Sequence, residues 1–195
     1  MKKTWLRFRQ EGLRDALREV VYFKRIMVAV AKDLEAGPSP MNPPLRTIIV
    51  NGQNYGRYKK YPGIGNVLHH CRRGACALLL FRDMDLLGYQ LWTMDKNFAD
   101  LKKLGLSLKD NEAYLFDLFV YPRYRGTAVP KIIATETFNH LVSRGINKIC
   151  GFYFKDNIKA LWWHKATLKA REIKQVPTSR LFMVEFTAGR ITWKL

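Results

Sequence analysis

The chain has 195 residues, of which 48% are hydrophobic and 26% are charged, and this length fits one globular domain. Aromatic residues make up 13%, which excludes general disorder, and no apolar run reaches the roughly 18 residues that cross a bilayer. The net charge is +18, because 34 lysines and arginines face 16 aspartates and glutamates. Such a field attracts phosphates, nucleic acids, acidic proteins or membrane surfaces without choosing among them.

Cysteine usage and the first residues both bear on the compartment. Cys71, Cys76 and Cys150 make an odd count, which argues against a disulfide framework and fits a reducing environment. Residues 1–10 are basic, but charges interrupt any apolar signal-peptide core, so we expect a cytoplasmic protein. Two histidines directly before Cys71, taken with Cys76, match no standard zinc spacing. We therefore predict no metal site.

The first third of the chain divides into two segments. Apolar residues recur at three- and four-residue steps over residues 13–35, which predicts an amphipathic helix and an N-terminal helical region over residues 1–36. Residues 37–75 are rich in proline, glycine and tyrosine and hold six basic and no acidic residues, with a short strand expected at residues 48–50. Tyrosines alternate with bases at residues 55–61. They could stack on nucleic acid, cover an anionic substrate, or pin a solvated loop.

The remaining elements alternate between strands and helices. Residues 76–81 and 86–93 predict a hairpin, and residues 95–104 predict either a short helix capped by its first residue or an irregular connection. A strand, a helix, a strand, a helix and three strands are then expected over residues 113–121, 127–144, 148–154, 157–168, 171–176, 180–186 and 190–194. Asp156 is expected to cap the second of these helices. This order predicts a mixed α/β sheet in a single domain over residues 1–195.

One segment carries chemistry, where an apolar strand passes directly into a helix. It reads Arg123-Tyr124-Arg125-Gly126-Thr127-Ala128. The N–H groups of a first helical turn have no partner within the helix, and the helix dipole adds positive potential there. Gly126 and the small Ala128 would let a ligand approach the backbone, and Arg123 and Arg125 would add charge. These features favour a pyrophosphate-binding turn, although a turn with merely solvated arginines would carry the same residues.

The same six residues resemble the Q/R-x-x-G-x-G/A signature of the GCN5-related N-acetyltransferases, the GNAT superfamily. Residues 118–122 are similar to the strand that leads into that signature, and residues 156–164 resemble the family's N-x-x-A helix. The resemblance covers residues 76–175. It implies a GNAT-like α/β domain, with its core over residues 76–195. In its mixed central sheet, the strand that ends at the signature and the next one splay apart between flanking helices.

The resemblance also implies a thioester site. Acetyl-CoA or another acyl-CoA would donate its acyl group directly to a primary amine, without a metal. Backbone groups of Leu118 and Val120 would hydrogen-bond the pantetheine arm, and Asn157 would contact the pantetheine or cysteamine end. The pyrophosphate would be held by the backbone N–H groups of Arg125, Gly126, Thr127 and Ala128, with Arg123 adding charge.

Direct transfer also needs a base for the amine and an acid for the leaving thiolate. Asp117, in mid-strand beside the expected splay, is the preferred base, and Glu112 is the second candidate. Asp117 could instead be paired with a nearby lysine or arginine. The family commonly has a tyrosine as acid seven residues after the asparagine, where this chain has His164. Imidazole can do that work near neutral pH, but His164 could be an ordinary histidine, which leaves Tyr153 and Tyr124 as substitutes.

Three functions remain open at this point. The first is an N-acyltransferase that uses acyl-CoA, with acetyl as the expected group. The second takes a longer acyl chain from an acyl carrier protein, whose acidic surface a chain of +18 would attract, and it needs a deep apolar tunnel beyond the splay. The third is a non-catalytic nucleic-acid-binding module, which no recognition motif supports. The acceptor would be selected by loops, at residues 37–75 and in the C-terminal hairpin.

Overall fold

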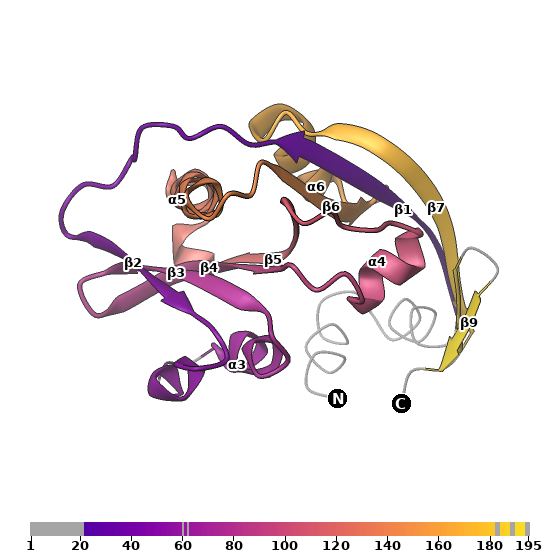
Figure 1. The fold of residues 1–195 in the computed structure, drawn as a ribbon, viewed down its shortest axis with the longest axis horizontal. Coiled ribbons are helices and arrows are strands. Elements are labelled where there is room, and N and C mark those ends of the chain that lie inside the picture. Colours follow the sequence, from indigo (N-terminus) through magenta and orange to yellow (C-terminus); the bar gives the residue numbers. More distant parts are fainter. Residues whose placement is uncertain (1–21, 60, 62, 182–183, 188–189, 194–195) are drawn as a thin grey trace.

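The computed structural model describes residues 22–59, 61, 63–181, 184–187 and 190–193. These residues form one mixed sheet of nine strands in the order β2-β3-β4-β5-β6-β1-β7-β8-β9, with helices against both faces (Figure 1). The predicted α/β class with a mixed central sheet is therefore confirmed. No helix among the described residues is long and apolar enough to cross a membrane.

The first half of the sheet is antiparallel. β2 (Leu45–Val50) pairs with β3 (Cys76–Arg82), and β3 forms the expected hairpin with β4 (Asp85–Thr93). β4 then pairs with β5 (Glu112–Val120). Most side chains of β3 and β4 are buried, because α5 covers one face and α3 covers the other.

The centre of the sheet contains its parallel pair. β5 is followed by η2 (Pro122–Tyr124) and α5 (Val129–Ser143), and the chain returns as β6 (Lys148–Phe154) parallel to β5. Only three residue pairs join the two strands, and the last is Tyr114 with Cys150. Beyond that pair the strands diverge, so the predicted splay is present.

β1 (Tyr22–Asp33) lies beside β6, where the sequence predicted part of an amphipathic helix, and the helix prediction is wrong for these residues. Residues 1–21, which carry the rest of the predicted helical region, lie outside the described residues. β1 runs antiparallel to both β6 and β7 (Arg171–Leu181), and every side chain from Met27 to Ala31 is buried. A strand between two others buries both of its faces, so its nearly continuous apolar run imitated helical spacing.

The helices divide between the two faces (Figure 1). α5 covers the face formed by β3, β4 and β5, whereas α3 (Gly65–Cys71) and α4 (Ala99–Leu104) cover the opposite face, which we call the α3 face. α3 and the short helix η1 (Tyr55–Tyr58) were not predicted, since proline and glycine dominate residues 37–75. Asp95 does not cap α4, because its carboxylate accepts from the Asn97 N–H at 2.8 Å and the cap residue is Phe98.

The helix predicted over residues 157–168 is shorter and changes form. α6 (Ile158–Trp162) continues into a π-helical turn, η3 (Trp163–Thr167). The cap prediction is wrong: Oδ1 of Asn157 accepts the Ala160 N–H at 3.1 Å, while Asp156 forms an ion pair with Arg25 at 3.0 Å. Beyond β7, β8 (Val184–Thr187) and β9 (Arg190–Trp193) complete the sheet in antiparallel order.

Candidate active site

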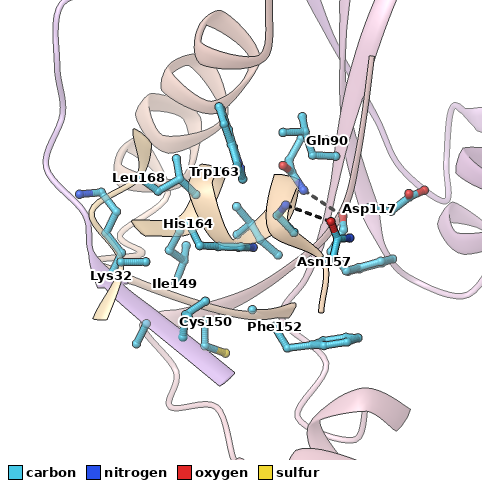
Figure 2. A pocket seen from close by; sticks show the side chains of 18 of the residues that line it. Lys32, Gln90, Asp117, Ile149, Cys150, Phe152, Asn157, Trp163, His164 and Leu168 are labelled. Atoms are coloured by element: carbon cyan, nitrogen blue, oxygen red, sulfur yellow. Dashed lines mark hydrogen bonds between the residues drawn. The ribbon is translucent and has the colours of Figure 1, made fainter. Parts of the chain in front are cut away.

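A pocket of about 580 Å³ opens where β5 and β6 diverge (Figure 2). Its walls are the diverging parts of β5 and β6, the end of β1, and the helical segment from Asn157 to Leu168. Arg125, from the turn before α5, also lines it. This β5–β6 pocket has the volume of an ordinary small-molecule site and joins both sequence motifs.

β5 is bulged along this wall. Its register against β4 shifts between Tyr89 and Leu91, and Asp117 takes a left-handed backbone conformation with φ +53°. The buried Gln90 amide donates to the Phe116 carbonyl at 2.9 Å, a bond drawn in Figure 2, and to the Leu91 carbonyl at 3.0 Å. Gln90 therefore satisfies a carbonyl that the bulge frees from the strand ladder. Gln90 was not among the residues predicted from the sequence, where its signal is a single amide in a largely apolar strand.

Leu118 lines the pocket, whereas the carbonyl group of Val120 already has a hydrogen-bond partner. The Val120 carbonyl accepts a hydrogen bond from Nε of Arg125 at 3.1 Å, so the side chain of Arg125 occupies an acceptor that was assigned to pantetheine. β4 meets this part of β5 at Gly88, which pairs with Val120. A Cβ on Gly88 would lie 2.4 Å from the Phe119 carbonyl oxygen, so only glycine permits this approach.

The turn before α5 presents unpaired backbone donors. Gly126 has φ +79°, and a Cβ there would meet no atom within 4 Å. The Thr127 hydroxyl donates to the Tyr124 carbonyl at 2.6 Å and accepts from the Val129 N–H at 3.2 Å, which fixes the turn. Within the described chain, the N–H groups of residues 126–128 meet no acceptor, whereas that of Arg125 bonds to the Pro122 carbonyl at 3.2 Å. Three of the four predicted donors are thus available to an anion.

Arg123 and Tyr124 have a different position from the one expected. The Arg123 guanidinium and the Tyr124 hydroxyl both bond to the carboxylate of Asp85, and the guanidinium lies 4.8 Å from the centre of the Tyr124 ring. The hydrogen bond to Asp85 raises the pKa of Tyr124. This cluster ties the turn to β4, so the charge of Arg123 is compensated rather than directed at a ligand.

His164 and Asn157 both line the pocket (Figure 2). The His164 ring stacks on Tyr153, with ring centres 5.3 Å apart, and its buried Nδ1 has no hydrogen-bond partner in the described chain. Burial lowers the pKa of His164 to about 4, so its imidazole is neutral at neutral pH. Tyr153, the substitute acid, donates to Glu172 at 2.8 Å, and burial together with that bond raises its pKa to about 12.

The two candidate bases lie in different environments. The buried Glu112 accepts from Nζ of Lys148 at 2.8 Å and from the Lys109 N–H at 3.0 Å; burial opposes ionisation, but these bonds lower its pKa overall. Asp117 is exposed, and its carboxylate accepts from the Asn66 amide and from the Tyr89 hydroxyl, the latter at 3.1 Å. Within the part of the chain that the structure describes, no lysine or arginine pairs with Asp117.

The structure explains the tyrosines of the basic loop. Tyr55, Tyr58 and Tyr61 pack on the hydrophobic cluster beneath α3, and the ring centre of Tyr61 is 5.1 Å from that of Phe81. Their rings therefore anchor the basic loop to the sheet.

Over the described ranges, no group of three histidine, cysteine, aspartate or glutamate side chains could hold a metal ion.

Comparison with known proteins identifies the fold. No family model matches the chain, and no curated protein matches it. Among solved structures, a GCN5-related N-acetyltransferase-like protein from Streptococcus suis superposes with a TM-score of 0.54 at 10% identity, covering 88% of this chain and 68% of that protein. A GCN5-related N-acetyltransferase from Sphaerobacter thermophilus gives 0.52 at 14% identity, covering 88% and 57%.

A tandem GNAT protein from the clavulanic acid biosynthesis pathway gives a TM-score of 0.52 at 11% identity, covering 89% of this chain and 59% of that protein. The chain spans 57% to 63% of the length of four of the solved proteins that it resembles. The likeness therefore extends over most of this chain and, at identities of 10% to 14%, shows the fold alone.

Proposed function

We propose that this chain, whose fold is that of the GCN5-related N-acetyltransferases, is an N-acyltransferase that moves an acyl group, in the first instance acetyl, from coenzyme A to a primary amine. One observation carries the proposal. The three unpaired N–H groups of residues 126–128 begin α5 beside a pocket that opens between two diverging strands. Backbone donors at a helix N-terminus suit the pyrophosphate, and the pocket suits the pantetheine arm and thioester.

The donor would be held largely by backbone groups. Leu118 offers its main chain inside the β5–β6 pocket, and the side chain of Asn157 reaches the same space from the start of α6. The Val120 carbonyl becomes available when the guanidinium of Arg125 turns away, and that guanidinium is then free to meet a phosphate. Arg125 therefore exchanges a backbone partner for an anion when the donor binds.

Once the donor and the amine are positioned, the transfer needs only the movement of protons from the amine and to the leaving sulfur. The amine nitrogen forms a bond to the thioester carbon, the carbon–sulfur bond breaks, and the sulfur leaves as a thiolate that later takes up a proton. Asp117 accepts the proton that the nitrogen loses. Because His164 is neutral, it does not release a proton as an imidazolium ion; it stabilises the sulfur by donating a hydrogen bond.

The positive charge supports a second source of the donor. A chain of +18 would attract an acidic acyl carrier protein, whose phosphopantetheine would enter the same pocket without an adenosine moiety. Thermal unfolding with CoA, acetyl-CoA, a long-chain acyl-CoA and the matching acyl carrier protein distinguishes these donors, because a ligand that binds the native state raises the midpoint. Stabilisation by the charged carrier protein alone would favour the carrier.

The sharpest test of the donor site uses two matched glycines. Gly126→Trp should abolish the acetyl-CoA affinity measured by calorimetry, because the indole would fill the open space above the unpaired N–H groups. Gly145→Trp is the control: Gly145 has φ +78°, its Cβ would also meet nothing within 4 Å, and it follows the other end of α5. Equal acetyl-CoA affinity in the two folded variants would refute the pyrophosphate assignment.

A further inference from the structure

Asp117 belongs to both sides of the sheet. Its main chain forms part of the wall of the β5–β6 pocket, yet its side chain leaves β5 on the α3 face. Figure 2 shows its carboxylate directed away from Asn157 and Gln90, which lie inside the pocket. The left-handed φ of +53° at the bulge produces this reversal. The carboxylate of Asp117 therefore lies on the α3 face, while the main chain of the same residue forms part of the pocket wall.

The partners of Asp117 leave half of its carboxylate unused. The Asn66 amide and the Tyr89 hydroxyl both donate to Oδ2, and within the described chain Oδ1 has no partner. Only 3% of Tyr89 is exposed, so its hydroxyl cannot turn away and the carboxylate of Asp117 keeps a fixed direction. Both partners are neutral donors, although cations outnumber acidic residues twofold in this chain. A carboxylate that is oriented but not neutralised can accept a cation.

Aromatic rings pack beside the residues that adjoin this carboxylate. Phe119 stacks on Tyr89 with ring centres 5.3 Å apart and meets Tyr121 edge-on at 5.1 Å. Phe116, which precedes Asp117 in β5, meets His70 of α3 with ring centres 4.9 Å apart. Burial lowers the pKa of His70, with a further contribution from His69, and together these outweigh the opposing effect of the Asp117 carboxylate, so that the ring is neutral at neutral pH. The side chains that hold Asp117 are therefore neutral and one of them packs against an aromatic ring, and aromatic faces attract ammonium groups.

We propose that the acceptor approaches from the α3 face, and that Asn66 and Tyr89 are positioning residues that direct Oδ1 of Asp117 at its ammonium group. The acceptor is a primary amine whose adjoining carbon skeleton is apolar and carries no carboxylate. An acceptor with a carboxylate next to its amine would place a like charge beside Asp117. This inference rests on the proposed function and assigns the substrate class of that site.

Binding of small probes tests the assignment without knowledge of the natural acceptor. Phenethylammonium, 2-phenylethanol and phenylalanine share one aromatic arm and differ in charge, so their affinities can be compared by NMR titration of the isotope-labelled protein in the presence of acetyl-CoA. We expect the resonances of residues 116–121 to respond to phenethylammonium at roughly tenfold lower concentrations than to either other probe, because its ammonium gains a charge-assisted hydrogen bond to the Asp117 carboxylate that the alcohol lacks.

The variants separate positioning from structural damage. Asn66→Ala and Tyr89→Phe should lower the affinity for phenethylammonium and leave that for 2-phenylethanol unchanged, whereas a merely structural role would lower both. Asp117→Asn should remove the preference for the ammonium entirely. Tyr58→Phe, which alters a tyrosine of the same face that makes no contact with Asp117, and Asp110→Asn, which removes a carboxylate paired with Lys96, are the controls.

The outcomes distinguish the two proposals. Acetyl-CoA that binds while phenethylammonium shows no preference over 2-phenylethanol, or a preference that survives Asp117→Asn, would overturn the acceptor assignment and leave the proposed function in place. A preference that depends on Asp117 in a protein that does not bind acetyl-CoA would support the cation site and overturn the proposed function. Tighter binding of phenylalanine than of phenethylammonium would also overturn the assignment.

Discussion

Gly88→Ala should destabilise the protein and distort the pocket wall together. A Cβ at this position would lie 2.4 Å from the Phe119 carbonyl oxygen, 3.0 Å from Cδ1 of Ile133 and 3.1 Å from Cα of Val120. The first and third contacts are backbone atoms of β5, so relief requires β4 and β5 to separate. Overpacking of this kind costs about 1–3 kcal/mol, and we expect the upper part of that range because no side-chain movement can relieve the two backbone contacts.

Urea unfolding followed by circular dichroism measures this loss of stability, and Gly56→Ala is the control. Gly56 also lacks a positive φ, and its Cβ would meet nothing within 4 Å. In thermal unfolding, a loss of about 2–3 kcal/mol would lower the midpoint temperature by roughly 4–12 °C for a chain of this size. Acetyl-CoA affinity should fall in the same variant, because Val120 lies in the displaced strand. A stability within about 0.5 kcal/mol of the Gly56→Ala protein would refute the close-approach argument.

Three further predictions concern the turn and the pocket. Gln90→Leu leaves the Phe116 carbonyl without its donor, and calorimetric unfolding should show a loss of about 1–3 kcal/mol, with Gln53→Leu, on the exposed surface, close to wild type. Thr127→Val removes the hydroxyl that accepts the Val129 N–H and should cost about 1 kcal/mol in urea unfolding, whereas Thr127→Ser should cost less because it keeps the bond. The third concerns His164, whose native pKa of about 4 lies below its ordinary value of 6.5, so the unfolded chain binds its proton first as the pH falls. Stability should therefore decline from about pH 6.5 to about pH 4, by at most about 3 kcal/mol, and urea unfolding at several pH values should show a flatter profile for His164→Phe; an unchanged profile would contradict this explanation.

The elements that were predicted well are those whose signal is local. β6 occupies the predicted residues, and α5 begins and ends within two residues of its prediction, because Pro130 and Gly145 mark its ends. The turn at Gly126 was predictable for the same reason, since a glycine between a strand and a helix constrains the backbone wherever it occurs. β1 was mistaken because burial on both faces removes the alternation that distinguishes a strand.

The site residues that lie close together in the sequence were predictable, whereas those brought together by packing were not. Asn157 and His164 line the β5–β6 pocket together with the main chain of Asp117, whose carboxylate lies on the α3 face; the roles of all three in the reaction stay predictions. Asn66 and Tyr89 were missed, because they reach Asp117 across 51 and 28 positions of sequence, through the packing of α3 and a neighbouring strand. The ion pairing of Arg123 was missed likewise, since its partner Asp85 lies in a separate hairpin.

The central position of β1 has a consequence for biosynthesis. Residues 22–33 leave the ribosome before both strands that flank them, which lie within residues 148–181. The apolar run from Met27 to Ala31 therefore has no sheet partner until β6 and β7 have been translated. The antiparallel half from β2 to β5 can pair earlier, whereas the other half must wait for the return of the chain. Nascent chains of this protein thus carry an unpaired, aggregation-prone strand until β6 and β7 emerge.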